Sequence, residues 1–78
     1  MTNFERVRKV VANTLNVSVD SVTMKTSQEN LAVWDSLAHV NLVMALEKEF
    51  DLELEVEVFM ELNSVEAILR YLENADAG

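Results

Sequence analysis

The sequence predicts an all-α protein, a small four-helix bundle with a short third helix and a long loop between the first and second helices. Two observations indicate this architecture. Apolar residues recur at helical spacing in separate stretches of the chain. No linker separates these stretches, so a single small helical bundle is the economical architecture. Because the chain has 78 residues and no internal repeat, we expect a single domain over residues 1–78.

The first helix is predicted from Thr2 to Leu15, where apolar residues lie three or four positions apart. A polar connection follows over residues 16–34. Loops of this length are uncommon unless they are functional or held in place. We therefore expect its apolar residues to fasten it across the helices. These residues are Val17, Val19, Val22, Met24 and Leu31.

The second helix is predicted from Asp35 to Phe50 and has two apolar faces. Asp35 or Ser36 can cap it, because short polar side chains accept hydrogen bonds from the first free backbone amides. Helical periodicity of about 100° per residue separates the faces. One holds Leu42, Val43, Leu46 and Phe50 with His39 beside them, and the other holds Leu37, Val40 and Met44. The first can meet the core, and the second is predicted to be a docking stripe for another protein. Alternatively, the long loop buries both faces.

The segment from Asp51 to Val58 alternates acidic and apolar residues, which is typical of a strand. An isolated strand would have no partner for its backbone groups. We therefore expect an extended start that tightens into a short helix near Val56 to Leu62. The last helix begins at Asn63 or Ser64, and Asn63 and Glu66 have the spacing of a capping box.

The formal net charge of −8 restricts the partners of the chain. Nucleic acid requires a basic footprint, and an anionic membrane surface repels an acidic protein, so we expect neither. Basic protein partners fit the charge through electrostatic steering, although acidity also serves solubility alone.

Several other classes of site and location are disfavoured by composition. The chain has no cysteine, which removes disulfides and thiolate metal sites, and no glycine is placed for an EF-hand loop. We therefore expect no metal site. No apolar run has the length of a membrane span, and the first residues lack the order of a signal peptide. We expect a cytoplasmic protein.

Ser36 is the candidate functional residue. It follows Trp34 and Asp35 at the mouth of the second helix, where free amides and the helix dipole favour a phosphate ester. The alternative is that Ser36 is only a cap. Nucleophilic catalysis would need an adjacent base held by a third group. The only histidine, His39, lies on the core side of the helix, so we do not expect an enzyme.

These residues resemble those of acyl carrier proteins. The similarity is carried by Leu15-Asn16-Val17, Asp35-Ser36-Leu37, Val40, Leu42-Val43-Met44-Ala45-Leu46-Glu47, Glu49-Phe50-Asp51 and Ser64-Val65-Glu66-Ala67. It covers nearly the whole chain. It implies that a Mg²⁺-dependent phosphopantetheinyl transferase attaches phosphopantetheine from coenzyme A to Ser36, with Asp35 capping the helix and contacting the transferase. The arm would hold acyl groups as thioesters for enzymes of fatty-acid, polyketide or related biosynthesis.

The resemblance also implies how such a carrier meets its partners. Similar proteins bind acyl-loading or acyl-transferring enzymes whose docking patches are basic. We also expect this chain to be a monomer. Here the docking residues would be the stripe of Leu37, Val40 and Met44, with Glu47 and Glu49 as its acidic flank.

The chain departs from the fatty-acid carriers on this face. Ala38, Asn41 and Lys48 stand where acids are common, and the glycine often found before Asp-Ser-Leu is missing. We infer a specialised carrier with its own partners. Two alternatives stay open. A peptidyl or aminoacyl carrier shares the fold and the modified serine, and an unmodified acidic helical module would bind a partner helix through its spare apolar face.

Overall fold

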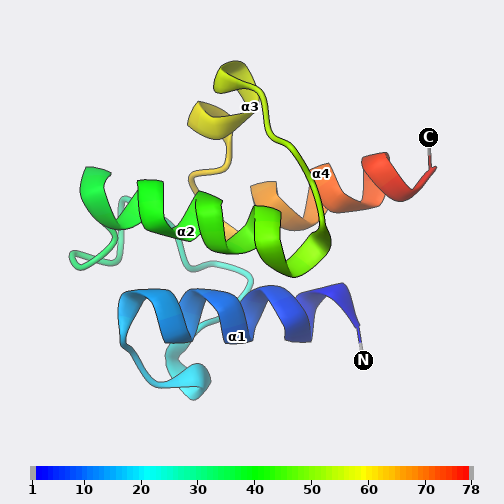
Figure 1. Ribbon diagram of the computed structural model, residues 1–78. Coiled ribbons are helices and arrows are strands. Elements are labelled where there is room, and N and C mark those ends of the chain that lie inside the picture. Colours follow the sequence, from blue (N-terminus) through cyan, green and yellow to red (C-terminus); the bar gives the residue numbers. More distant parts are fainter. Residues whose placement is uncertain (1, 78) are drawn as a thin grey trace.

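The computed structural model describes residues 2–77, with side chains described through residue 74. Within that range the protein has four α-helices and one short 3-10 helix (Figure 1). They are α1 (Asn3–Leu15), η1 (Val19–Ser21), α2 (Ser36–Phe50), α3 (Val56–Glu61) and α4 (Val65–Ala77). The predicted all-α bundle, with its short third helix and long first connection, is confirmed.

The helices α1 and α2 lie side by side and run in opposite directions, and α4 packs on α1 (Figure 1). The short helix α3 lies on the other side of α2 from α1 in this view. The long connection passes behind α1 and α2 before it reaches the start of α2. This arrangement places the beginning of α2 at one end of the molecule, within reach of α3.

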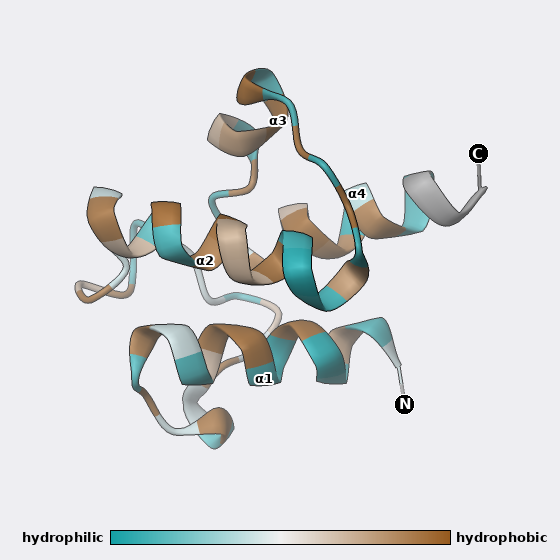
Figure 2. Cartoon of the chain, in the orientation of Figure 1, coloured by the Kyte–Doolittle hydropathy of each residue, from teal (hydrophilic) through white to brown (hydrophobic). Residues whose placement is uncertain are grey.

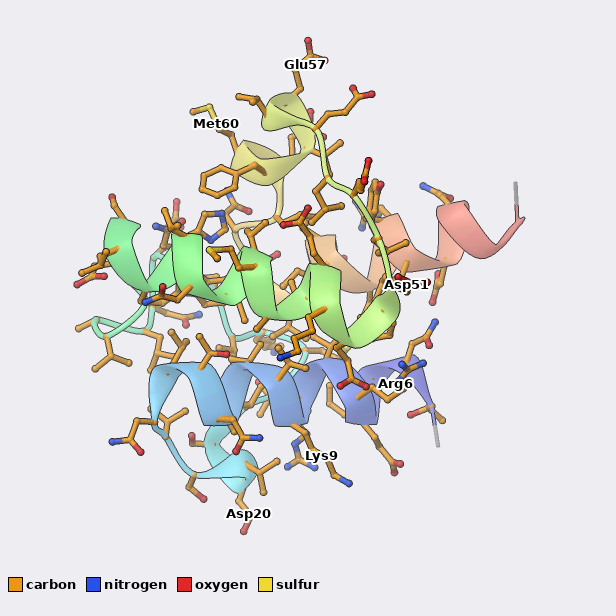
Figure 3. All side chains as sticks on the ribbon, viewed as in Figure 1. Arg6, Lys9, Asp20, Asp51, Glu57 and Met60 are labelled. Carbon is orange, nitrogen blue, oxygen red and sulfur yellow. The ribbon has the colours of Figure 1, made fainter. Side chains whose placement is uncertain are left out.

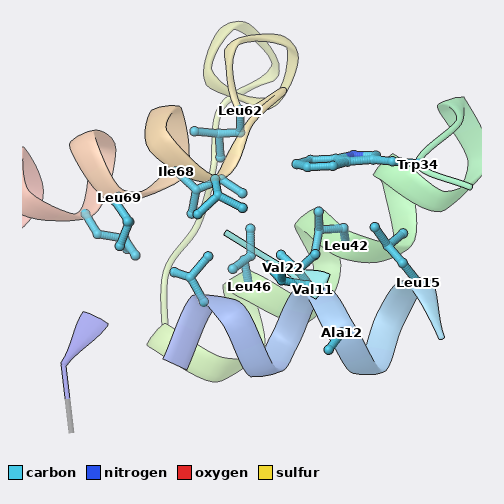
Figure 4. Packing of buried hydrophobic residues seen from close by; sticks show 13 residues of the cluster. Val11, Ala12, Leu15, Val22, Trp34, Leu42, Leu46, Leu62, Ile68 and Leu69 are labelled. Carbon is cyan, nitrogen blue, oxygen red and sulfur yellow. The ribbon is translucent and has the colours of Figure 1, made fainter. Parts of the chain in front are cut away.

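The core lies where α1, α2 and α4 meet, and it is closed by residues of the connections (Figure 4). Trp34, just before α2, lies over Leu42 in this view. Burying a Val, Leu or Ile side chain stabilises the fold by about 1.5–3 kcal/mol. The buried cluster consists of Val7, Val11, Ala12, Leu15, Val22, Trp34, Leu42, Leu46, Leu62, Val65, Ile68, Leu69 and Leu72.

Three of the α-helices begin at short polar caps. The hydroxyl of Thr2 accepts a hydrogen bond from the amide of Glu5, and the Asp35 carboxylate accepts one from the amide of Ala38. The hydroxyl of Ser64 caps α4 by accepting from the amide of Ala67 at 3.0 Å. The predicted capping box between Asn63 and Glu66 is therefore wrong, since the cap lies one residue later.

The long connection is fastened mainly by backbone hydrogen bonds. The amide of Gln28 donates to the Asn63 carbonyl at 2.8 Å, and the amide of Val65 donates to the Thr26 carbonyl at 2.9 Å. These bonds flank a one-pair β-bridge between Ser27 and Ser64. Because backbone groups carry the attachment, residue type along the loop gives little sign of it.

The apolar residues of this connection divide into two groups. Val22 is fully buried, while Val17 and Leu31 pack partly against the core. Val19, in the unpredicted helix η1, and Met24 are exposed. The expectation that all five fasten the loop is wrong for these last two.

The segment between α2 and α3 is extended, as expected from its alternation. Figure 2 shows hydrophilic and hydrophobic residues alternating along it. Leu52 and Leu54 are half-buried, whereas Glu53 and Glu55 are exposed. The chain then turns into α3, which confirms the short helix predicted near Val56 to Leu62.

Both long helices at the centre of the bundle end in a left-handed residue that is not glycine. Asn16 follows α1 with φ 57°, and Asp51 follows α2 with φ 53°. At each, the backbone amide donates to a carbonyl in the last turn of its helix. Glycine is the usual residue here because a Cβ atom crowds this conformation. Asp51 also adds a negative charge at the negative end of the α2 dipole.

Replacing Asp51 with glycine should stabilise the protein by about 0.5–1 kcal/mol, because the left-handed conformation no longer carries a Cβ atom. Urea unfolding followed by circular dichroism measures the change. Asp51→Asn is the matched control, since it removes the charge but keeps the side chain. If the glycine variant were no more stable than the asparagine variant, the effect would be electrostatic and the backbone explanation wrong.

Candidate functional site

Ser36 is the first residue of α2, and its side chain is exposed. Asp35 precedes it in an extended conformation, which ends the loop and aims the chain into the helix. Within the described residues the Ser36 hydroxyl has no hydrogen-bond partner, unlike the Ser64 hydroxyl that caps α4. The expectation of an exposed hydroxyl at the helix start is confirmed. The alternative that Ser36 is the cap is wrong, because Asp35 fills that position.

The first turn of α2 has two backbone amides ahead of its hydrogen-bond ladder. The amide of Ala38 donates to Asp35 Oδ1 at 2.8 Å, and the amide of His39 donates to the Asp35 carbonyl at 2.8 Å. The amides of Ser36 and Leu37 come before these and lie beyond the ladder of the helix. They point out of its positive end, which favours an anion beside the Ser36 hydroxyl.

An open hollow of about 260 Å³ lies beside Ser36, between the start of α2 and α3. Its walls combine polar groups near the serine with apolar groups from both helices. The lining residues are Gln28, Ser36, His39, Val40, Phe59 and Met60. Met60 projects outward from α3 at the rim (Figure 3). A flexible group attached to Ser36 would meet this surface first.

His39 lies beneath the hollow and joins three parts of the chain. Its Nδ1 receives the indole N–H of Trp34 at 3.0 Å, and its Nε2 lies 2.7 Å from the carbonyl oxygen of Phe59 in α3. The Phe59 ring meets the imidazole edge-on, with the ring centroids 4.9 Å apart. His39 is 5% exposed and Trp34 is 1% exposed. We call this arrangement of Trp34, His39 and Phe59 the histidine bridge.

The predicted stripe on α2 is exposed. Leu37, Val40 and Met44 have 74%, 41% and 62% of their surface in water. The opposite face, with His39, Leu42, Val43 and Leu46, is buried. The long loop therefore does not cover both faces, and the alternative that it does is wrong. Exposed apolar residues at this spacing form a continuous surface along the helix.

The two acids predicted to flank this stripe both have partners inside the chain. Glu47 Oε2 accepts a hydrogen bond from the amide of Leu54 at 3.0 Å, which fastens the turn after α2. Glu49 pairs with Arg6 of α1, whose Nη2 lies 3.1 Å from Glu49 Oε2. Figure 3 shows Arg6 beside the last turn of α2. Both acids therefore hold the fold together at the far end of α2 from Ser36.

The structure also shows which residue extends the stripe. Helical periodicity of about 100° per residue aligns Lys48 with Leu37 and Met44, whereas Glu49 lies on the side that faces α1. Lys48 is exposed. The far end of the stripe is therefore basic, and Glu47 is its nearest acid on the same helix. A helical projection of the sequence alone would have placed Lys48, and not Glu49, at the end of the stripe.

The histidine bridge is the element of the site that the sequence did not indicate. The position of His39 on the core side was predicted from periodicity, and its burial confirms it. Its partners lie five and twenty residues away along the chain, and one of them is a backbone carbonyl. A carbonyl has no sequence signature, although an indole and an imidazole in the same site suggest a donor and an acceptor.

Two further observations bear on the kind of site. Among the side chains described for residues 2–74, no three His, Asp or Glu groups gather closely enough to hold a metal ion. None of the described helices combines the length and the apolar character needed to cross a lipid bilayer.

Comparison with known protein families matches residues 5–72 to the phosphopantetheine attachment site family. Domains of this family are non-catalytic carriers that bear a covalently attached phosphopantetheine group. The matched residues run from α1 into α4 and include all of α2 with its exposed serine. The chain therefore belongs to the phosphopantetheine attachment site family and is a carrier domain of that family.

Proposed function

We propose that this chain is an acyl carrier protein and that Ser36 bears its phosphopantetheine arm. The observation that carries the proposal is the exposed, unpaired Ser36 hydroxyl at the positive end of α2, inside the matched residues. A phosphodiester at this position would lie beside the amides of Ser36 and Leu37. The flexible arm would extend over the hollow between α2 and α3.

The attachment is a phosphoryl transfer performed by a separate phosphopantetheinyl transferase. The Ser36 oxygen forms a bond to the phosphorus that carries the pantetheine in coenzyme A, and the pyrophosphate bond breaks. Adenosine bisphosphate leaves, and the hydroxyl proton passes to a base or solvent at the transferase. Mg²⁺ held by that enzyme neutralises the phosphates. The chain contributes an accessible nucleophile on a rigid helix end.

Asp35 has two parts in this proposal. Its carboxylate orders the first turn of α2 by capping Ala38, so the position of Ser36 does not depend on the transferase. Its exposed side chain also offers a contact for that enzyme. Because the carboxylate adds a negative charge next to the phosphodiester, the two anions share the positive end of one helix.

We further propose that Leu37, Val40 and Met44 dock the transferase and the enzymes that load or remove the acyl group. Their exposure and their position on the face that continues from Ser36 support this role.

Glu47 and Glu49 would attract basic partner patches, although both also have hydrogen-bond or ion-pair partners inside the chain. Lys48, Ala38 and Asn41 make the stripe less acidic than in fatty-acid carriers, which supports a specialised member of the family.

The apolar lining of the hollow supports an acyl cargo, since Val40, Phe59 and Met60 line the surface that an arm on Ser36 would cross. We propose that the carrier works as a monomer in the cytoplasm, where coenzyme A is available, and serves fatty-acid, polyketide or related biosynthesis. An aminoacyl cargo would make it a peptidyl carrier instead. Loading assays with acyl and aminoacyl donors distinguish the two.

Incubation with coenzyme A, Mg²⁺ and a broad-specificity transferase should add one phosphopantetheine to the wild-type chain, as measured by intact mass. Ser36→Ala should gain nothing, because the accepting oxygen is gone. The matched control is Ser18→Ala, which removes an exposed hydroxyl that caps η1 at a distance from α2. Fragmentation then locates the group. An unmodified wild-type chain, or an arm on another residue, would show that the proposal is wrong.

Met44→Arg should lower kcat/KM for the transferase by roughly tenfold or more, because it removes an apolar contact and puts a cation against a basic partner. Val19→Arg is the control, since it adds the same charge at an exposed apolar residue of η1. Initial rates at subsaturating carrier measure the effect. Equal losses in both variants would point to overall charge and against a docking stripe.

A further inference from the structure

We propose that His39 determines where the cargo rests. The histidine bridge keeps the seam between α2 and α3 closed next to Ser36, so that a thioester-linked acyl chain stays at the surface and does not enter the bundle there. This inference rests on the proposed function, because it concerns an arm attached to Ser36.

The bridge fixes the state of the imidazole ring. An indole nitrogen can only donate a hydrogen bond, so His39 Nδ1 must accept from Trp34. The other ring nitrogen, Nε2, then carries the hydrogen and donates it to the Phe59 carbonyl. Both ring nitrogens are therefore used, and one neutral tautomer of His39 links the loop before α2 to the backbone of α3.

The histidine bridge lies where it can block an acyl chain from entering between α2 and α3. His39 lies one helical turn after Ser36 and forms part of the hollow that an arm on Ser36 would meet. At the base of the hollow the ring is tied to α3 by the hydrogen bond to the Phe59 carbonyl and by the contact with the Phe59 ring, and to the loop before α2 by Trp34. A chain that passed inward at this point would have to separate Phe59 from His39 or His39 from Trp34.

Separating α2 from α3 at this point costs free energy because it breaks buried hydrogen bonds. A purely apolar contact would not have this cost. Separation leaves a buried indole N–H, an imidazole nitrogen or a carbonyl without a partner, and none of these is compensated by a hydrocarbon chain. An apolar residue at position 39 would fill similar space and could move aside without losing a hydrogen bond. The histidine therefore discriminates against a buried apolar cargo.

Because α3 has few other anchors, the hydrogen bond from His39 has a large effect on whether α2 and α3 separate. This helix has six residues and lacks a side-chain cap at its start, and Val56 and Met60 lie largely in water. Helices this short are unstable without tertiary contacts. The hydrogen bond from His39 to the Phe59 carbonyl is a directional anchor for α3, so removing it should let α3 move and open the seam.

The experiment compares cargo of different length on three forms of the carrier. Acetyl-, hexanoyl- and decanoyl-pantetheine arms are loaded onto Ser36 from the corresponding acyl coenzyme A, and intact mass confirms each product. The forms are wild type, His39→Leu, and His39→Gln, whose amide can both accept from Trp34 and donate to Phe59. The readouts are the melting temperature and the rate of thioester cleavage by hydroxylamine.

In the wild type, both readouts should be independent of acyl length. In His39→Leu, the melting temperature should rise with acyl length, and decanoyl cleavage should be about tenfold slower than acetyl cleavage, since burying a few methylene groups is worth such a factor. His39→Gln should restore independence of length. A merely structural role would lower the melting temperature of His39→Leu equally for all cargoes.

Long-range ¹H–¹⁵N spectra of the wild type provide a test that needs no variant and should show the Nε2–H tautomer of His39. The other tautomer would overturn the proposal. Slower cleavage of the decanoyl thioester in the wild type would also overturn this inference, and so would length-independent behaviour in His39→Leu. Neither result would contradict the attachment of the arm to Ser36. Failure of any arm to load would instead overturn the proposed function, and this inference would fall with it.

Discussion

The second helix has apolar residues on two sides, and a chain of 78 residues has a core for only one of them. Leu42 and Leu46 take that place, because α2 packs against α1 and both leucines join the buried cluster that α4 also enters. This packing fixes the rotation of α2 about its axis. The same rotation leaves Leu37 and Met44 in water and sets the Ser36 hydroxyl at the exposed end. The packing of one face therefore determines both the exposed apolar stripe on α2 and the presentation of the serine.

Much of this could be predicted from the sequence, because it depends on local periodicity and on short polar caps. The boundaries of α1 and α2, the buried side of α2 and the exposure of Ser36 all follow from residues within a few positions of each other. The cap at Ser64 and not Asn63 shows the limit of such reasoning, since both residue types suit the position.

The features that could not be predicted involve residues far apart in the sequence or backbone atoms. The loop is fastened to the start of α4 through carbonyl and amide groups, which any residue type would supply. Glu49 pairs with Arg6 across 43 residues, and the guanidinium also lies over the Phe50 ring at 4.3 Å. The bridge at His39 combines both difficulties, because it joins an indole before α2 to a carbonyl in α3.

The described methionines give the molecule a specific sensitivity to oxidants. Met24, Met44 and Met60 are all exposed, so peroxide reaches them without any opening of the bundle. Conversion to the sulfoxide replaces a soft apolar group with a polar, chiral one. At Met60 the change would fall on the hollow beside the serine, and at Met44 on the exposed stripe of α2. The buried cluster, built without methionine, would keep its packing. Oxidation would thus change the exposed apolar surface of a carrier that still looks fully folded, and a methionine sulfoxide reductase would reverse the change.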